Sequence, residues 1–129
     1  MPRAALTGRP FVKALLERGY PVDESRDFLQ RTELYIAAEF SRSTVDLFLN
    51  AGADPNHLDY NGKTPLFGAI WSRNNNNVRL LLAAGAKVDV TSRSGESLLS
   101  FAESHLKSEE NSHEIWCMLS AAHEQTHCQ

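Results

Sequence analysis

The sequence lacks most features that mark several large classes of protein. It has two cysteines, Cys117 and Cys128, which are too few for a disulfide framework and suit a reducing compartment. Its 13 basic and 16 acidic residues nearly balance, so no strong positive field favours nucleic acid. No apolar run approaches the ~20 residues of a membrane span, and the charged start does not resemble a secretory signal. We expect one cytoplasmic domain without a nucleic-acid or membrane partner.

Catalytic motifs are missing too. There is no glycine-rich phosphate loop, no G-x-S-x-G and no H-E-x-x-H. The best candidate metal cluster combines Cys117 and Cys128 with His123 and His127, which would share a face if a helix reached them. A loose polar tail explains this segment more simply. We therefore expect no enzyme, no metal and no cofactor, with a metal-dependent enzyme as the alternative.

What the sequence does contain is an internal repeat with a period of 33 residues. Glycines, leucines and valines recur together at this spacing, and shorter motifs with Thr or Ser recur upstream of them. The three phased sets are Gly19, Gly52 and Gly85; Leu16, Leu49 and Leu82; and Val12, Val45 and Val78. Such a period indicates stacked structural repeats.

The sequence pattern of each unit predicts two helices and an extended arm. In the first helix, Thr32, Thr64 or Ser97 can cap the free N–H groups, and Pro65 suits the first helical position. The second helix is expected to end at a glycine in the left-handed conformation. The asparagines at 74–77 predict a left-handed link whose side chain caps the next helix.

These residues resemble the ankyrin repeat, most closely in "DYNGKTPLFGA" followed by "VRLLLAAGAKVD", with Phe67 where the family pattern has histidine. The resemblance implies an all-α solenoid of helix-turn-helix units with β-hairpin-like arms, forming one domain over 1–129. The expected units are a partial repeat at 1–23, repeats at 24–56 and 57–89, a C-terminal capping repeat with a lengthened helix link at 90–123, and a tail at 124–129.

Stacking should merge the apolar faces of these units into one core. The residues expected there are Leu15, Leu16, Phe48, Leu49, Leu81 and Leu82. Gln30 replaces the turn glycine of the other arms, which predicts a distorted first arm, and "HLKSEENSHE" predicts a long surface loop. The incomplete first unit would expose apolar surface, so we expect a monomer or weak self-association.

The resemblance also implies that hairpin tips and first helices bind a partner protein on a concave face. The matching positions are Arg26, Phe28, Arg31, Phe40, Leu58, Tyr60, Asn61, Lys63, Trp71, Arg93 and His105. Large aromatics such as Tyr60 and Trp71 are typical binding hot spots, while core packing is an equal alternative for Phe28 and Phe40. The basic residues would suit a partner with an acidic patch.

We therefore predict a protein-binding module that is not an enzyme. Because the chain shows no room for an effector domain, binding itself would be its activity, as in a stoichiometric inhibitor or neutraliser. The ankyrin-repeat family, which this sequence resembles, includes small immunity proteins that neutralise their targets in this way. The alternative is a scaffold or adaptor fragment of a larger ankyrin-repeat protein, which the truncated first unit suggests.

Overall fold

The computed structural model describes residues 9–19, 32–40, 44–106 and 114–119. Within these ranges the labelled helices are α1 (Arg9–Glu17), α2 (Glu33–Glu39), α3 (Val45–Asn50), α4 (Pro65–Ser72), α5 (Asn75–Ala83) and α6 (Leu98–Leu106). A further helical segment spans 114–119. One antiparallel bridge joins Thr91 to Ser97 in an arm. The predicted all-α solenoid with hairpin-like arms is confirmed.

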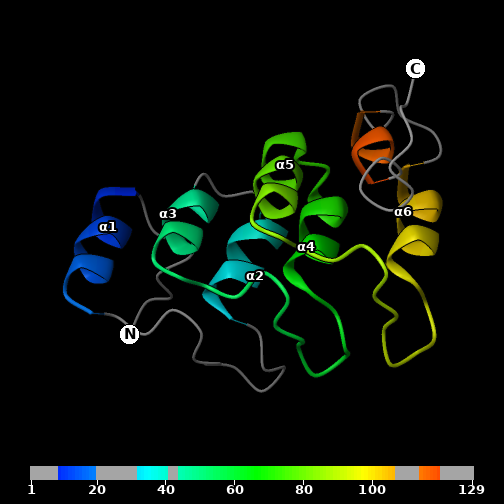
Figure 1. Cartoon of the computed structure of the whole chain (residues 1–129), viewed down its shortest axis with the longest axis horizontal. Helices are drawn as coiled ribbons and strands as arrows, with labels where there is room; N and C mark the ends of the chain where they lie inside the picture. The colour runs from blue at the N-terminus through cyan, green and yellow to red at the C-terminus, as the bar shows by residue number, and fades with distance from the viewer. Residues whose placement is uncertain (1–8, 20–31, 41–43, 107–113, 120–129) are drawn as a thin grey trace.

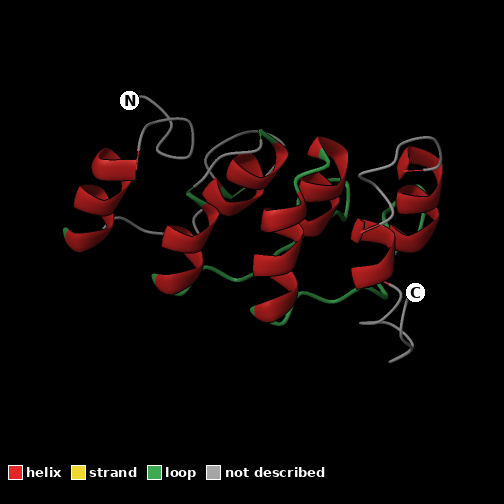
Figure 2. Ribbon diagram, turned by 90° about the horizontal axis from the view of Figure 1, so that it is seen from above, coloured by secondary structure: helices red, strands yellow, loops and turns green. Residues whose placement is uncertain are grey.

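The helices lie in two layers (Figures 1 and 2). Helix α4 packs between α2 and α6 in one layer, while α3 packs between α1 and α5 in the other. Contacts between α2 and α3 and between α4 and α5 join the layers. Each helix pair thus buries its apolar side against a neighbouring pair, as stacked repeats require. None of the described helices is long and apolar enough to cross a membrane.

The first helices begin with different caps. The Thr32 hydroxyl accepts a hydrogen bond from the Tyr35 N–H at 3.3 Å, and Ser97 caps α6 in the same way. The predicted Thr64 cap is wrong, because its hydroxyl is buried without a hydrogen-bond partner in the structure. The Phe67 N–H, which would have donated to it, bonds to the Thr64 carbonyl at 3.0 Å instead. Pro65 occupies the first turn as predicted.

The second helices end as expected, and Gly19, Gly52 and Gly85 all have positive φ. The asparagine link is only half as predicted. Asn74 caps α5 by accepting from the Asn77 N–H at 3.0 Å, but the left-handed residue is Arg73, with φ 55°. Asn74 needs an extended backbone to present its side chain as a cap, so the left-handed step falls one residue earlier.

The core lies between the two layers. The period-33 valines are fully buried there with Phe48 and Leu81. Leucines at four other expected core positions are only partly buried and pack against its edge, which corrects their assignment: Leu15, Leu16, Leu49 and Leu82. Leu49 and Leu82 directly follow the fully buried Phe48 and Leu81, and therefore point toward the side of that layer. Leu15 and Leu16 lie on α1, which packs mainly against α3 among the described helices.

Polar contacts fasten the outer elements. The Arg9 guanidinium donates two hydrogen bonds to the Asp46 carboxylate at 2.7 and 3.1 Å, which joins α1 to α3. This hydrogen bond holds the pKa of Asp46 below its usual value, against the opposing effect of burial. The Glu114 carboxylate accepts from Arg79 and, at 2.8 Å, from Asn75, and so holds segment 114–119 to α5.

Several expectations concern residues outside the described ranges. They are the distorted arm at Gln30, most of the long loop in "HLKSEENSHE" and the remnant before Arg9. Cys117 is disulfide-bonded, whereas Cys128, His123 and His127 lie outside those ranges. The bridge is not what the expected reducing compartment favours, which corrects the expectation drawn from the cysteine count, although a single bridge is not the framework of a small disulfide-rich domain.

Candidate functional site

Two described arms, at 57–64 and 90–97, project from the layer that contains α4 and α6 (Figure 1). We call the surface formed by these arms and the exposed side of α2, α4 and α6 the inner face. Asp59 shapes the first arm, because its carboxylate accepts from the backbone N–H groups of Asn61 and Lys63 at 2.8 and 2.9 Å. The turn also carries an Asp59 N–H to Lys63 carbonyl bond at 2.9 Å. Asp59 is thus a turn former, as predicted, and leaves Tyr60 exposed.

The second arm packs directly against the first. The Arg93 N–H donates to the Asn61 carbonyl at 2.9 Å, and the Arg93 guanidinium carbon lies 5.2 Å from the centre of the Tyr60 ring. Gly62 permits this approach, since a Cβ there would lie 3.1 Å from the Arg93 nitrogen. The contact fixes Tyr60 and Arg93 side by side on the inner face.

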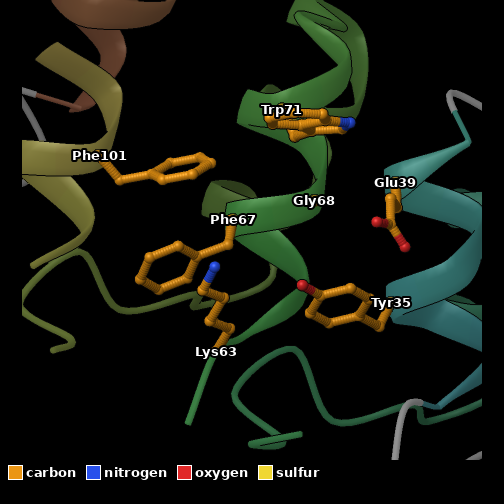
Figure 3. Close-up of a pocket in the computed structure, with 7 residues that line it drawn as sticks. All are labelled: Tyr35, Glu39, Lys63, Phe67, Gly68, Trp71 and Phe101. Atoms are coloured by element: carbon orange, nitrogen blue, oxygen red, sulfur yellow. The ribbon is translucent and has the colours of Figure 1, made fainter. Parts of the chain in front are cut away.

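A pocket of about 220 Å³ opens on the inner face among α2, α4 and α6 (Figure 3). It is lined by Tyr35, Glu39, Lys63, Phe67, Gly68, Trp71 and Phe101. Gly68 lies in the middle of these residues, and a Cβ at this position would lie 3.0 Å from the Glu39 backbone nitrogen. The corresponding positions of the neighbouring units carry Ile36 and Phe101, which are large and buried. Gly68 therefore lets α2 approach α4 closely at the wall of the pocket.

Aromatic rings extend from the pocket toward α6. Phe67 and Phe101 have ring centres 5.4 Å apart, and His105 stacks on Phe101 at 4.1 Å. His105 also lies 5.0 Å from the Trp71 ring. The Lys63 ammonium lies 5.8 and 5.4 Å from the centres of Phe67 and Phe101. These contacts link α4, α6 and the first arm into one aromatic cluster.

His105 is positioned by two further contacts. Its Nδ1 lies 3.1 Å from the Phe101 carbonyl oxygen, which can only accept, so Nδ1 carries the proton in this contact. Arg73 donates from Nη2 to the His105 carbonyl at 2.9 Å, which ties the end of α4 to α6. Trp71 is therefore placed against a fixed imidazole ring.

The structure places the predicted residues in three groups. The large exposed side chains are Phe40, Leu58, Tyr60 and Trp71, with 53%, 53%, 52% and 57% of their surface accessible. The alternative prediction that Phe40 packs into the core is therefore wrong. Asn61 and Arg93 are also exposed, whereas Lys63 and His105 are half-buried instead of projecting outward, because each packs on aromatic rings. Arg26, Phe28 and Arg31 lie outside the described ranges.

Sequence reasoning missed four residues that line the pocket: Tyr35, Phe67, Gly68 and Phe101. The available signals were a glycine inside a predicted helix and Phe67 in place of the family's histidine. Among the described residues, no group of three or more His, Cys, Asp or Glu side chains could hold a metal ion.

Comparisons with known proteins agree with this architecture. The family described as ankyrin repeats in three copies matches residues 3–92. The chain belongs to the ankyrin-repeat family. Ankyrin repeats are protein–protein interaction modules, and the predicted resemblance is confirmed.

The relatives that the chain matches are proteins of several kinds. An ankyrin repeat-containing protein of Treponema pallidum (strain Nichols) is 37% identical over 90 residues, 69% of this chain and 30% of the relative. The ADP-ribosylation factor GTPase-activating protein AGD2 of Arabidopsis thaliana is 38% identical over 60% of this chain and 10% of its own length. Human ankyrin repeat and SOCS box protein 6 is 33% identical over 74% of this chain and 25% of its own length. This chain thus spans a third or less of these relatives.

Proposed function

We propose that this ankyrin-repeat chain binds a partner protein through its inner face and that binding, not catalysis, is its activity. The observation that carries the proposal is the exposure of Tyr60 and Trp71 beside a pocket on that face. Buried apolar residues stabilise the fold, but exposed aromatics do so much less. When a partner covers them, they bury a large area at a small cost in side-chain entropy.

The inner face is also preorganised. Tyr60 lies against Arg93, and Trp71 lies against His105, so both aromatic anchors have neighbours that limit their motion. The arms are fixed to each other by the bond from Arg93 to Asn61. A partner would therefore not have to order these elements when it binds, which lowers the entropic cost of association.

We favour a stoichiometric inhibitor or neutraliser, of which an immunity protein is one form, because the chain offers a binding face as its main feature. The inhibitor would act by covering the partner's functional surface in a 1:1 complex. This role requires a tight complex that abolishes the partner's activity.

A scaffold or adaptor is the second candidate. It is supported by the relatives, in which the matching region is 30%, 10% and 25% of a longer chain. A scaffold would bind its partner without inhibiting it. The two roles are separated by measuring the partner's activity in the complex.

The proposal is tested by affinity capture with the wild-type chain and the Tyr60→Ala/Trp71→Ala double variant, followed by mass spectrometry. Phe11→Ala is a matched control, since Phe11 is an aromatic residue with 46% exposure on α1, at the far end of the stack from α6. The proposal predicts a partner that is retained by the wild type and by Phe11→Ala and lost by the double variant. Retention by all three proteins would move the interface away from Tyr60 and Trp71.

A further inference from the structure

The pocket on the inner face contains a cation, Lys63, that forms no ion pair with any residue the structure describes. Lys63 lines it, is half-buried, and has its ammonium near the rings of Phe67 and Phe101. Within the described part of the chain, the Lys63 ammonium makes no hydrogen bond and no ion pair. Burial without a counter-charge is unfavourable for an ammonium group, and the aromatic faces offset only part of that cost.

A second cation lies on the neighbouring arm. The Arg93 guanidinium is stacked near Tyr60 and, in the part of the chain that the structure describes, has no carboxylate partner. The acidic residue in the same turn as Lys63, Asp59, is buried, and its carboxylate accepts two backbone N–H groups of its own turn. Lys63 in the pocket and Arg93 on the neighbouring arm are thus two positive groups held near aromatic rings, and the carboxylate of the nearby Asp59 is engaged in its own turn.

The size of the pocket limits what can enter it. Its volume of about 220 Å³ lies below the roughly 300–1,000 Å³ of pockets that take drug-sized ligands or cofactors. One side chain of a partner protein fits this scale better. The aromatic walls suit the apolar stem of such a side chain, and Lys63 suits an acidic end.

We propose that the pocket receives the side chain of a glutamate or aspartate from an acidic segment of the partner protein, whose carboxylate pairs with Lys63. Arg93 binds a second acidic residue of the same segment, and Trp71 covers the apolar stem. This inference rests on the proposed binding role of the inner face and adds the chemistry of its partner. A charge-assisted hydrogen bond to a preorganised, half-buried ammonium is stronger than one to a solvated lysine.

Glu39 distinguishes an acidic side chain in the pocket from the opposite case, a basic one. Its carboxylate lies across the pocket from Lys63 (Figure 3). A basic side chain from the partner would depend on Glu39 and would be repelled by Lys63, whereas an acidic one would depend on Lys63 and be repelled by Glu39. Removing one charge at a time therefore gives effects of opposite sign for the two kinds of partner.

The test pans a displayed library of short random peptides against the full chain and measures individual binders by fluorescence anisotropy. We expect the enriched peptides to share an aspartate or glutamate. Lys63→Met, which keeps the stem on the rings, should weaken their binding about tenfold, as loss of a charge-assisted hydrogen bond does. Glu39→Gln should leave affinity unchanged or increase it. Added salt should weaken the wild-type complex and affect the Lys63→Met complex less.

Arg93→Gln is the second variant, because Arg93 is exposed and its replacement leaves the packing of Phe67 and Phe101 intact. It should weaken the same peptides about threefold, in line with a partly solvated ion pair. Urea unfolding of each variant shows whether it is folded. The inference is overturned if no peptide is enriched, if the enriched peptides lack an acidic residue, or if Lys63→Met and Arg93→Gln both bind them as the wild type does.

Trp71→Ala separates failure of this inference from failure of the proposed function. Peptides that lose affinity with Trp71→Ala but not with Lys63→Met would use the inner face without an acidic anchor, which refutes the inference alone. Peptides that bind both variants and Tyr60→Ala normally would bind elsewhere, which counts against the inner face itself.

Discussion

The two described arms, 57–64 and 90–97, share two backbone hydrogen bonds within their turns and present different side chains. In the first arm Asp59 N–H bonds to the Lys63 carbonyl and Gly62 N–H to the Asp59 carbonyl; in the second, the same bonds join Ser92 to Glu96 and Gly95 to Ser92. Each donor and acceptor is displaced by one period of 33 residues. The repeat therefore fixes the backbone, while the side chains at equivalent positions decide what the surface can bind.

The surroundings of the two turns differ as well. A Cβ at Gly62 would meet the backbone of Arg93, whereas a Cβ at Gly95 would meet open space. The first arm has a neighbour on the side that the last described arm leaves open. The same backbone turn should thus tolerate change differently in the two arms.

The largest effect should come from Gly62→Ala. Both turn glycines have positive φ, 74° at Gly62 and 89° at Gly95, so alanine costs about 1–2 kcal/mol of folding stability at either position. At Gly62 the clash with Arg93 adds about 1–2 kcal/mol. Urea unfolding of the two variants measures the difference. Equal losses would mean that the arms do not pack as closely as described.

Asp59→Ala should have the next largest effect. The buried Asp59 carboxylate accepts two backbone N–H groups, so its loss should destabilise the fold by about 2 kcal/mol. The equivalent Ser92 hydroxyl contacts the Ser94 hydroxyl at 2.9 Å, and Ser92→Ala should cost about 1 kcal/mol or less. Thermal unfolding of both variants checks that Asp59→Ala loses more stability than Ser92→Ala. A larger loss for Ser92→Ala would contradict the prediction.

Gly68→Ala tests the helix that follows the first arm, α4. Alanine would gain up to about 1 kcal/mol in helix propensity but must push against the Glu39 backbone, which costs about 1–3 kcal/mol. The net loss should be about 1 kcal/mol, with a smaller pocket. A gain in the free energy of unfolding would show that α2 and α4 do not approach closely at Gly68.

Tyr60→Ala should change stability less than Gly62→Ala, Asp59→Ala or Gly68→Ala. The ring is half exposed, and its contact with Arg93 contributes about 0.5–1 kcal/mol at such a site. Chemical denaturation should give a loss of that size or less. A loss comparable to that of Asp59→Ala would make Tyr60 a folding residue and weaken its assignment to binding.

The pH dependence of stability tests the other layer. The lowered pKa of Asp46 means that its pair with Arg9 contributes stability above the ordinary carboxyl pKa and loses it as the pH falls through the lowered value. Asp46→Asn should therefore remove a small part of the acid sensitivity of the urea midpoint. The wild type and the variant should differ at neutral pH and converge in acid; a constant difference would contradict this role.

The period of 33 predicted the helices, their glycine ends and the arms, because these depend on local backbone preferences that repeat with the sequence. The failure of the Thr64 cap could not be predicted, because the hydroxyl and the carbonyl oxygen of Thr64 are both possible acceptors for the Phe67 N–H. In the structure the Phe67 N–H donates to the carbonyl. The pocket could not be predicted either. A glycine at position 68 signals a weak helix residue, and only the packing of α2 against α4 shows that the helices approach closely there, beside the pocket.

Among the predicted binding residues, the exposure of Tyr60 and Trp71 followed from their repeat positions. The half-burial of Lys63 and His105 did not, because it depends on Phe67 and Phe101 from two different units. Contacts between units are long-range in sequence, and periodicity within one unit carries no information about them.

The most direct test of the account is hydrogen–deuterium exchange of the full chain, alone and with the partner that it captures. We predict slower exchange at the arms 57–64 and 90–97 and at the end of α4 that carries Trp71, with little change in α1, α3 and α5. Slower exchange confined to α1, α3 and α5 would contradict binding through the inner face.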